Sequence, residues 1–186
     1  MSSTPQPGQP ILAMPTRVTA VEEPRWYAIH TRARYEKKVT TQLQDKGVAS
    51  FLPLIAQRHR CSDRYQTIQC ALFPCYAFVH LEAYPNKRLA ILQTPGVVGF
   101  VGTRGVGLPI PDKEIEDIRT LLIQNVTCAL YPFLIVGQRV RIRGGCLDGV
   151  EGILVAKNAD RSLVVSIELI QRSVAVRIDG YDVEMV

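Results

Sequence analysis

The sequence predicts an α+β fold, in which an N-terminal antiparallel sheet with helices packed on it is followed by a small SH3-like barrel of five strands. Two observations predict this class. Up to about residue 124, strand-like and helix-like segments alternate in the order β-α-β-β-α-β-α. From residue 134 onward only short strand-like segments follow, with turn-forming residues between them, as is typical of a small barrel.

The first three elements are predicted from composition and periodicity. Residues 25–31 are rich in aromatic and other strand-forming side chains, which favours a strand. Apolar side chains recur at a spacing of four over residues 35–46, so a helix is expected there, and Gly47 follows as a natural end. Residues 51–56 predict the second strand.

Five further elements complete the N-terminal part. The polar stretch after the second strand predicts an exposed hairpin or loop at 58–69. The other elements are a strand at 72–81, a short helix ending at Leu92, a strand at 97–103 and a helix that opens at Pro111 or Asp112. The last helix carries Ile115, Ile118 and Leu122 on one face. All helices are expected on one face of the sheet.

The strand at 76–81 separates two kinds of side chain by alternation. Ala77, Val79 and Leu81 share one face, and Tyr76, Phe78 and His80 share the other, because successive side chains of a strand point to opposite faces. We expect the aliphatic face to lie in the internal core. The aromatic face is then predicted to be exposed and to bind another protein, unless another part of the chain covers it.

The C-terminal part is predicted to contain five short strands. They are expected at Val140–Ile142, 153–156, 163–169, 174–178 and 183–186. Residues 125–133 have no sustained period and contain Pro132, which indicates a linker. The predicted organisation is a disordered tail at 1–24, a first domain at 25–124, a linker at 125–133 and a second domain at 134–186.

Charge and hydropathy favour a cytoplasmic protein that binds other macromolecules. The formal net charge is +5, and residues 25–60 hold eight basic residues against two acidic ones. Such a cluster either lies near nucleic acid or forms a solvated surface. No apolar run approaches the roughly 20 residues that span a bilayer, and the N-terminus lacks the pattern of a signal peptide.

The cysteines and histidines give little support for chemistry, so no enzyme, cofactor or metal is expected. The five cysteines form no C-x-x-C pair. An enzyme would use Cys61 or Cys75 as nucleophile with His59 or His80 as base, but Cys75 and His80 lie on opposite faces of one strand. A metal site at His59, Cys61 and Cys70 would need a fourth ligand at a workable spacing.

Two separate stretches of the chain resemble one family. The run from Val136 to Leu154, with its glycine-rich turn, resembles the KOW motif. The block L-F-P-C-Y-A-F-V at 72–79, with W-Y-A at 26–28 before it and T-P-G-V-V-G-F-V-G at 94–102 after it, resembles the N-terminal domain of the NusG family. Both blocks occur in the family's order. The chain therefore resembles a NusG-family transcription elongation factor that suppresses pausing or termination.

The resemblance implies how such a factor contacts its main partners. In this family the apolar face of the first domain binds the clamp helices of the largest catalytic subunit of RNA polymerase. The residues that the resemblance assigns to this contact are Ala28, His30, Phe73, Tyr76 and Phe78. Contact with the non-template DNA strand is expected from Lys87 and Arg88, and Arg32 and Arg34 extend the same basic path.

The resemblance also implies a partner for the KOW domain, either a small-subunit ribosomal protein or the termination factor Rho. The expected contacts are Ile167, Leu169, Ile170 and Arg172. Family members typically have an aromatic residue and a glycine where this chain has Ile170 and Gln171, and a proline where it has Cys146. These departures argue against Rho and favour a specialised, RfaH-like paralogue. A monomer is expected. The alternative is a ribosome- or RNA-binding KOW protein that does not bind polymerase.

Overall fold

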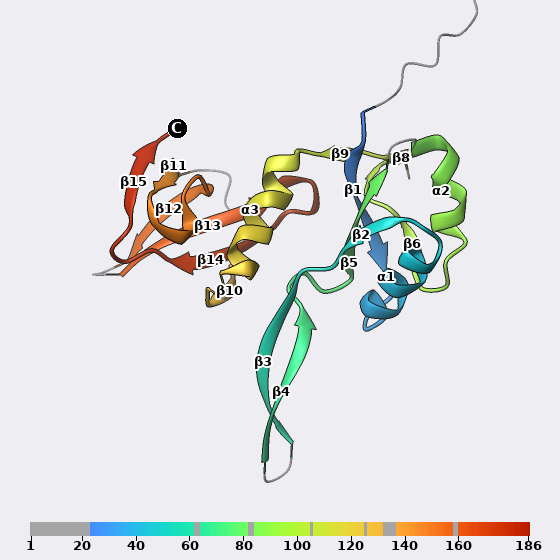
Figure 1. Ribbon diagram of the computed structural model, residues 1–186, viewed down its shortest axis with the longest axis horizontal. Helices are drawn as coiled ribbons and strands as arrows, with labels where there is room; N and C mark the ends of the chain where they lie inside the picture. The colour runs from blue at the N-terminus through green and yellow to red at the C-terminus, as the bar shows by residue number, and fades with distance from the viewer. Residues whose placement is uncertain are drawn as a thin grey trace, which may run out of the picture.

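The computed structural model describes residues 23–61, 64–81, 84–104, 106–124, 126–131, 137–157 and 160–186. Within these residues the chain has a mixed α/β fold with three α-helices and antiparallel sheets (Figure 1). None of the described helices is long and apolar enough to cross a membrane. The predicted disordered tail lies outside the described residues except for its last two positions.

The N-terminal sheet is centred on two antiparallel strands, β1 and β5, and its main order is β2-β5-β1-β6. A short strand, β9, also pairs with the start of β1. The bounds of these strands are β1 Arg25–Thr31, β2 Ala49–Phe51, β5 Tyr76–Leu81, β6 Val97–Phe100 and β9 Pro109–Ile110. Two further short strands, β7 (Gly102–Thr103) and β8 (Val106–Gly107), pair with each other.

Helices α1 (Glu36–Asp45) and α2 (Tyr84–Leu92) cover one face of this sheet. They form a core with the aliphatic side chains of β1 and β5. Ala77, Val79 and Leu81 are buried in this core, which confirms the alternation predicted for β5.

Helix α3 (Asp112–Ile123) lies on the opposite face, so the expectation that all helices share one face is wrong. Its apolar side chains cluster with the large rings of β1 and β5 rather than with α1 and α2. The physical reason is that β9 pairs with β1 directly before α3 begins and leads the chain onto that side.

A long β-hairpin projects from the N-terminal part (Figure 1). Strands β3 (Leu54–Cys61) and β4 (Arg64–Ala71) pair in regular register and form a sheet of their own. At its base, the Leu72 amide donates a hydrogen bond to the Pro53 carbonyl over 2.8 Å. This hairpin confirms the exposed hairpin predicted within 58–69, and the structure extends it at both ends.

The C-terminal sheet has the order β10-β14-β13-β12-β11-β15, with every pairing antiparallel. Its strands are β10 Cys128–Tyr131, β11 Gln138–Arg143, β12 Glu151–Lys157, β13 Asp160–Ile167, β14 Arg172–Arg177 and β15 Asp182–Met185. Strand β10 lies in the segment expected to be a linker, yet it pairs with β14. The closure of the other five strands into a barrel and the domain boundaries stay predictions.

The glycine-rich turn between β11 and β12 has the irregular backbone that the sequence predicts. It contains the short 3-10 helix η1 (Gly145–Leu147), and Gly145 adopts a φ of +71°. Gly152 serves a different purpose, since a Cβ there would lie 2.4 Å from the carbonyl oxygen of Val164 on the paired strand. The close approach of β12 and β13 therefore requires glycine at this position.

Lys46→Ala is expected to lower the free energy of unfolding by about 1 kcal/mol, because it removes the hydrogen bonds that the charged Lys46 ammonium donates and such bonds contribute on that order. The Lys46 ammonium donates to the Thr94 hydroxyl over 2.7 Å and to the Ala90 carbonyl over 3.1 Å, which ties the end of α1 to that of α2. Chemical denaturation of the full chain measures the loss. Lys37→Ala removes an exposed lysine from α1 and is the matched control, with a change near zero.

Candidate functional site

The candidate site is the aromatic face, defined here as Trp26, Ala28 and His30 of β1 with Tyr76, Phe78 and His80 of β5. The antiparallel register aligns these residues as three cross-strand pairs, Trp26 with His80, Ala28 with Phe78 and His30 with Tyr76. Ring centroids lie 4.7 Å apart in the first pair and 5.4 Å apart in the third. Cross-strand aromatic contacts of this kind stabilise the sheet and present one continuous ring-bearing surface.

Most of the aromatic face is covered by the protein itself, which corrects the expectation that it is exposed. Phe78 and Ala28 are 0% exposed, and so is Phe73, which precedes β5. Trp26 is also buried. His30 is exposed, and Tyr76 and His80 are half-buried, so solvent reaches the face mainly at the His30–Tyr76 edge and partly at His80.

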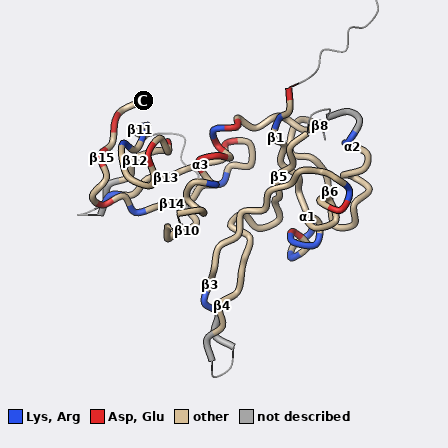
Figure 2. Tube along the Cα trace, in the orientation of Figure 1, with Lys and Arg blue, Asp and Glu red and all other residues tan. Residues whose placement is uncertain are grey.

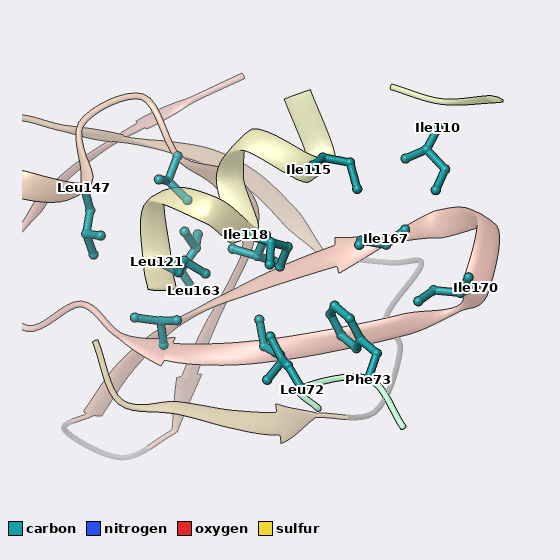
Figure 3. Packing of buried hydrophobic residues seen from close by; sticks show 14 of the residues in the cluster. Leu72, Phe73, Ile110, Ile115, Ile118, Leu121, Leu147, Leu163, Ile167 and Ile170 are labelled. Atoms are coloured by element: carbon teal, nitrogen blue, oxygen red, sulfur yellow. The ribbon is translucent and has the colours of Figure 1, made fainter. Parts of the chain in front are cut away.

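Two elements cover the aromatic face, namely α3 and the turn between β13 and β14. One hydrophobic cluster contains Phe73 and Phe78 together with Ile115 of α3 and with Ile167 and Ile170 from the C-terminal sheet. Figure 3 shows Ile115, Ile167 and Ile170 around the same core as Phe73. The N-terminal and C-terminal parts thus share one apolar core in this closed arrangement.

A cation stacks on the outer rings of the site. The Arg119 guanidinium of α3 lies 4.7 Å from the ring centroid of Trp26 and 4.9 Å from that of Phe51. Guanidinium groups are attracted to the negative faces of aromatic rings. Arg119 therefore fixes α3 over the sheet at the end away from His30 and Tyr76. No pattern in the sequence indicates this role.

Polar contacts join α3 to the C-terminal sheet. The Lys113 ammonium donates to the Gly149 carbonyl over 2.7 Å and forms an ion pair with Asp117. The Glu168 amide donates to the Glu114 carboxylate over 3.1 Å, and the Glu151 amide donates to the Asp117 carboxylate over 3.4 Å. A cleft of about 360 Å³ runs between these elements.

Burial shifts the protonation of both carboxylates on α3. It raises the pKa of Glu114 from 4.5 to about 7, with a further rise from the Glu168 charge, while the Glu168 amide and Arg139 act in the opposite direction. Burial likewise raises the pKa of Asp117, against the opposing effect of Lys113. Desolvation disfavours the charged form of a carboxylate and is the largest cause in each case.

The basic residues predicted to contact DNA lie on two separate elements. Arg32 and Arg34 follow β1 and are exposed, and Arg34 adopts a φ of +65° at the turn into α1. Lys87 and Arg88 lie on α2 and are half-buried. Figure 2 shows basic segments at α1 and at α2. Their role in DNA contact stays a prediction.

The residues predicted to bind a partner of the KOW domain fall in or beside the closed interface. Ile167 and Ile170 are buried in the cluster that contains Phe73. Leu169 is half-buried and Arg172 is exposed. The two predicted binding surfaces therefore cover each other, and neither is freely available in the closed arrangement.

The residues that the sequence offered for a metal or catalytic site are only partly described by the structure. No group of three or more His, Cys, Asp or Glu side chains is placed to hold a metal among the residues that the structure describes. The side chains of His59 and Cys61, which the metal and enzyme hypotheses used, lie outside that part. Cys75 lies in the turn before β5 with a φ of +69°, so the strand alternation that was expected to separate it from His80 does not extend to it.

Comparison with known proteins decides the family. A family model described as transcription termination factor nusG matches residues 24–119, slightly more than half of the 186-residue chain. The chain belongs to the NusG family. The match includes β1, β5 and most of α3, and therefore the whole aromatic face.

Curated NusG relatives cover nearly the whole chain. The transcription termination/antitermination protein NusG of Lactococcus lactis is 28% identical over 171 residues, which span 86% of this chain and 91% of that protein. The NusG protein of the same description from Staphylococcus aureus strain Mu50 is 28% identical over 173 residues. That from Borreliella burgdorferi is 25% identical over 181 residues. This chain is thus a NusG-family transcription factor.

A solved structure supports the NusG fold. The structure described as domain interaction in Thermotoga maritima NusG aligns with a TM-score of 0.54 at 22% identity, over 90% of this chain and 99% of that one. At this level of identity the likeness concerns the fold. It covers both the N-terminal and the C-terminal parts of the chain.

Proposed function

We propose that this NusG-type factor binds RNA polymerase through its aromatic face, suppresses pausing or termination, and recruits a second partner through its C-terminal KOW domain. The observation that carries the proposal is the ring-bearing surface of β1 and β5 within the family match. Large rings with polar tips are the residues that most often anchor protein interfaces. The clamp helices of the largest polymerase subunit are the proposed docking element.

Binding to polymerase requires that the closed arrangement opens. Phe73 and Phe78 are fully buried, so no partner can reach them while Ile167 and Ile170 occupy the same core. We infer that the C-terminal sheet and the polymerase compete for one surface. A population that opens transiently is sufficient, because a ligand shifts the equilibrium toward the state that it binds.

Competition for one surface also couples the two proposed partners. Opening exposes the aromatic face and, at the same time, Ile167 and Ile170 of the KOW domain. A ribosomal protein or other partner that holds the KOW domain open therefore favours polymerase binding, and thermodynamic reciprocity requires the reverse as well. Positive coupling of this kind suits a factor that acts only where both partners are present, as an RfaH-like paralogue would.

The basic residues are proposed to contact the non-template DNA strand beside the polymerase. Arg32 and Arg34 are exposed and lie next to the open edge at His30. Lys87 and Arg88 would extend the contact from α2. Phosphate contacts by arginine and lysine are sensitive to salt and carry little sequence preference.

Tyr76→Ala is expected to weaken binding to purified RNA polymerase by about tenfold or more, as loss of an aromatic anchor does. Tyr76 is half-buried and contacts His30 at the accessible edge, so its loss disturbs the core less than loss of Phe78. Tyr35→Ala is the matched control, because Tyr35 is a ring of the same size, 39% exposed and located at the start of α1. Equal binding of Tyr76→Ala and wild type contradicts the proposed face.

Transcription in vitro tests the activity itself. Purified polymerase is run through a pause site and a Rho-dependent terminator, with and without the protein. Longer transcripts support antitermination, and earlier release contradicts it. No effect on transcription and no binding to polymerase would favour the alternative, a ribosome- or RNA-binding KOW protein.

A further inference from the structure

The contact between α3 and the C-terminal sheet contains two carboxylates that polymerase binding does not use. Glu114 is half-buried and Asp117 is 5% exposed. Each accepts a hydrogen bond from a backbone amide of the C-terminal part, Glu114 from Glu168 of the 3-10 helix η2 (Glu168–Ile170) and Asp117 from Glu151 of β12. Both carboxylates therefore lie at the contact that must separate when the aromatic face becomes accessible.

Acidic and basic groups from every adjoining element face Glu114. Helix α3 contributes Lys113 and Asp117, η2 contributes Glu168, β11 contributes Arg139 and β12 contributes Glu151. Two of the nearby cations already have acidic partners, since Lys113 pairs with Asp117 and Arg141 pairs with Glu151 over 2.6 Å. The charges of Glu168 and Asp117 raise the pKa of Glu114, and the charge of Arg139 lowers it.

Desolvation therefore decides the protonation of Glu114. In the closed arrangement burial raises its pKa to about 7, in spite of the hydrogen bond from the Glu168 amide. When the C-terminal sheet moves away, Glu114 loses this burial, so its pKa is expected to return toward the ordinary value of 4.5. The pKa of Asp117 is shifted in the same direction by the same cause.

We propose that Glu114 makes the closed arrangement pH-dependent, so that closure is favoured as the pH falls and opening is favoured as the pH rises toward neutrality and above. The closed form binds the proton more tightly than the open form, and linkage therefore drives closure at low pH. Below pH 4.5 both forms hold the proton, and above pH 7 both have lost it. The change is confined to the window between these values.

The effect of this switch follows from proton linkage. One linked proton changes the ratio of open to closed molecules by at most about tenfold per pH unit within the window. Glu114 keeps some solvent contact, so we expect about three- to tenfold more open molecules at pH 7.5 than at pH 5.5. The consequence for polymerase rests on the proposed function, whereas the opening itself does not.

The titration of Glu114 can be measured directly in the full chain. Carboxyl-carbon NMR is expected to show Glu114 titrating near pH 7 in the closed protein, and the Glu168 amide proton should shift with the same midpoint. Small-angle X-ray scattering across pH 5.5 to 8.5 reports the opening as a rise in the radius of gyration. A Glu114 midpoint near its ordinary value of 4.5 in the closed protein overturns the proposal.

A variant pair separates Glu114 from the other carboxylates. Glu114→Gln keeps an oxygen that accepts from the Glu168 amide but cannot ionise, so most of the pH dependence of opening should disappear and the closed form should persist at pH 8. Glu116→Gln neutralises an exposed glutamate of the same helix and should leave the wild-type profile unchanged. An unchanged profile in Glu114→Gln overturns the proposal. These readouts contain no polymerase, so they stand apart from any failure of the proposed function.

Discussion

Ile170→Arg is expected to open the closed arrangement and to raise the affinity of the full chain for RNA polymerase by about ten- to a hundredfold. Ile170 is 6% exposed and lies in the apolar cluster that contains Phe73 and Ile115. A guanidinium in that position loses its water without gaining a partner, which disfavours the closed form by several kcal/mol in order of magnitude. The open form exposes residue 170 on a surface turn and tolerates the charge.

Two measurements and one control test this result. Hydrogen exchange of residues 72–81 should become faster in Ile170→Arg, because the C-terminal sheet no longer covers them, and polymerase binding should become tighter. Met185→Arg introduces the same charge at a site that is 74% exposed and should change neither quantity. Faster exchange without tighter binding would mean that the aromatic face is not the polymerase site. Unchanged exchange would mean that Ile170 does not hold the two parts together.

Alternation along β5 predicted which side chains share a face but could not predict which face is covered. The period of two is a property of the strand alone, and it placed Ala77, Val79 and Leu81 in the core correctly. The cover over the face that holds Phe78 comes from α3 and from Ile167 and Ile170, the last two about 90 residues farther along the chain. Contacts of that sequence separation leave no local pattern, because each partner alone resembles an ordinary apolar residue.

The ends of strands could not be predicted from the sequence where a proline or pairing with a distant strand determines them. The strand expected at 51–56 is divided at Pro53 into the end of β2 and the start of β3, since proline lacks the amide that a ladder needs. Strand β10 carries no clear alternation, and it exists because its residues pair with β14. Such strands are defined by their partners more than by their own sequence.

The charged residues of α3 were overlooked for a similar reason. Lys113 and Asp117 stand four apart, a spacing that predicts an ion pair on a helix surface. The sequence could not show that this surface, together with Glu114, meets the C-terminal sheet. Charge on a helix usually indicates a solvated face, and here it lines the contact between two parts of one chain.

Phe78→Ala is expected to lower the free energy of unfolding by about 3 to 5 kcal/mol, the range observed for loss of a buried phenylalanine ring. Phe78 is 0% exposed and its ring centroid lies 6.2 Å from that of Phe51 and 6.3 Å from that of Phe73. Both neighbours would face a cavity, because a sheet and a helix enclose the site and cannot collapse fully into it.

Chemical denaturation of the full chain measures this loss, and Val98→Ala is its control. Val98 lies on β6 of the same sheet but is 59% exposed, so its truncation should change the stability by less than about 0.5 kcal/mol. A Phe78→Ala chain that loses less than about 1 kcal/mol would show that the apolar core is loosely packed around this ring. That outcome would also contradict the effect expected for Ile170→Arg, because both effects require the same apolar cluster to exclude water.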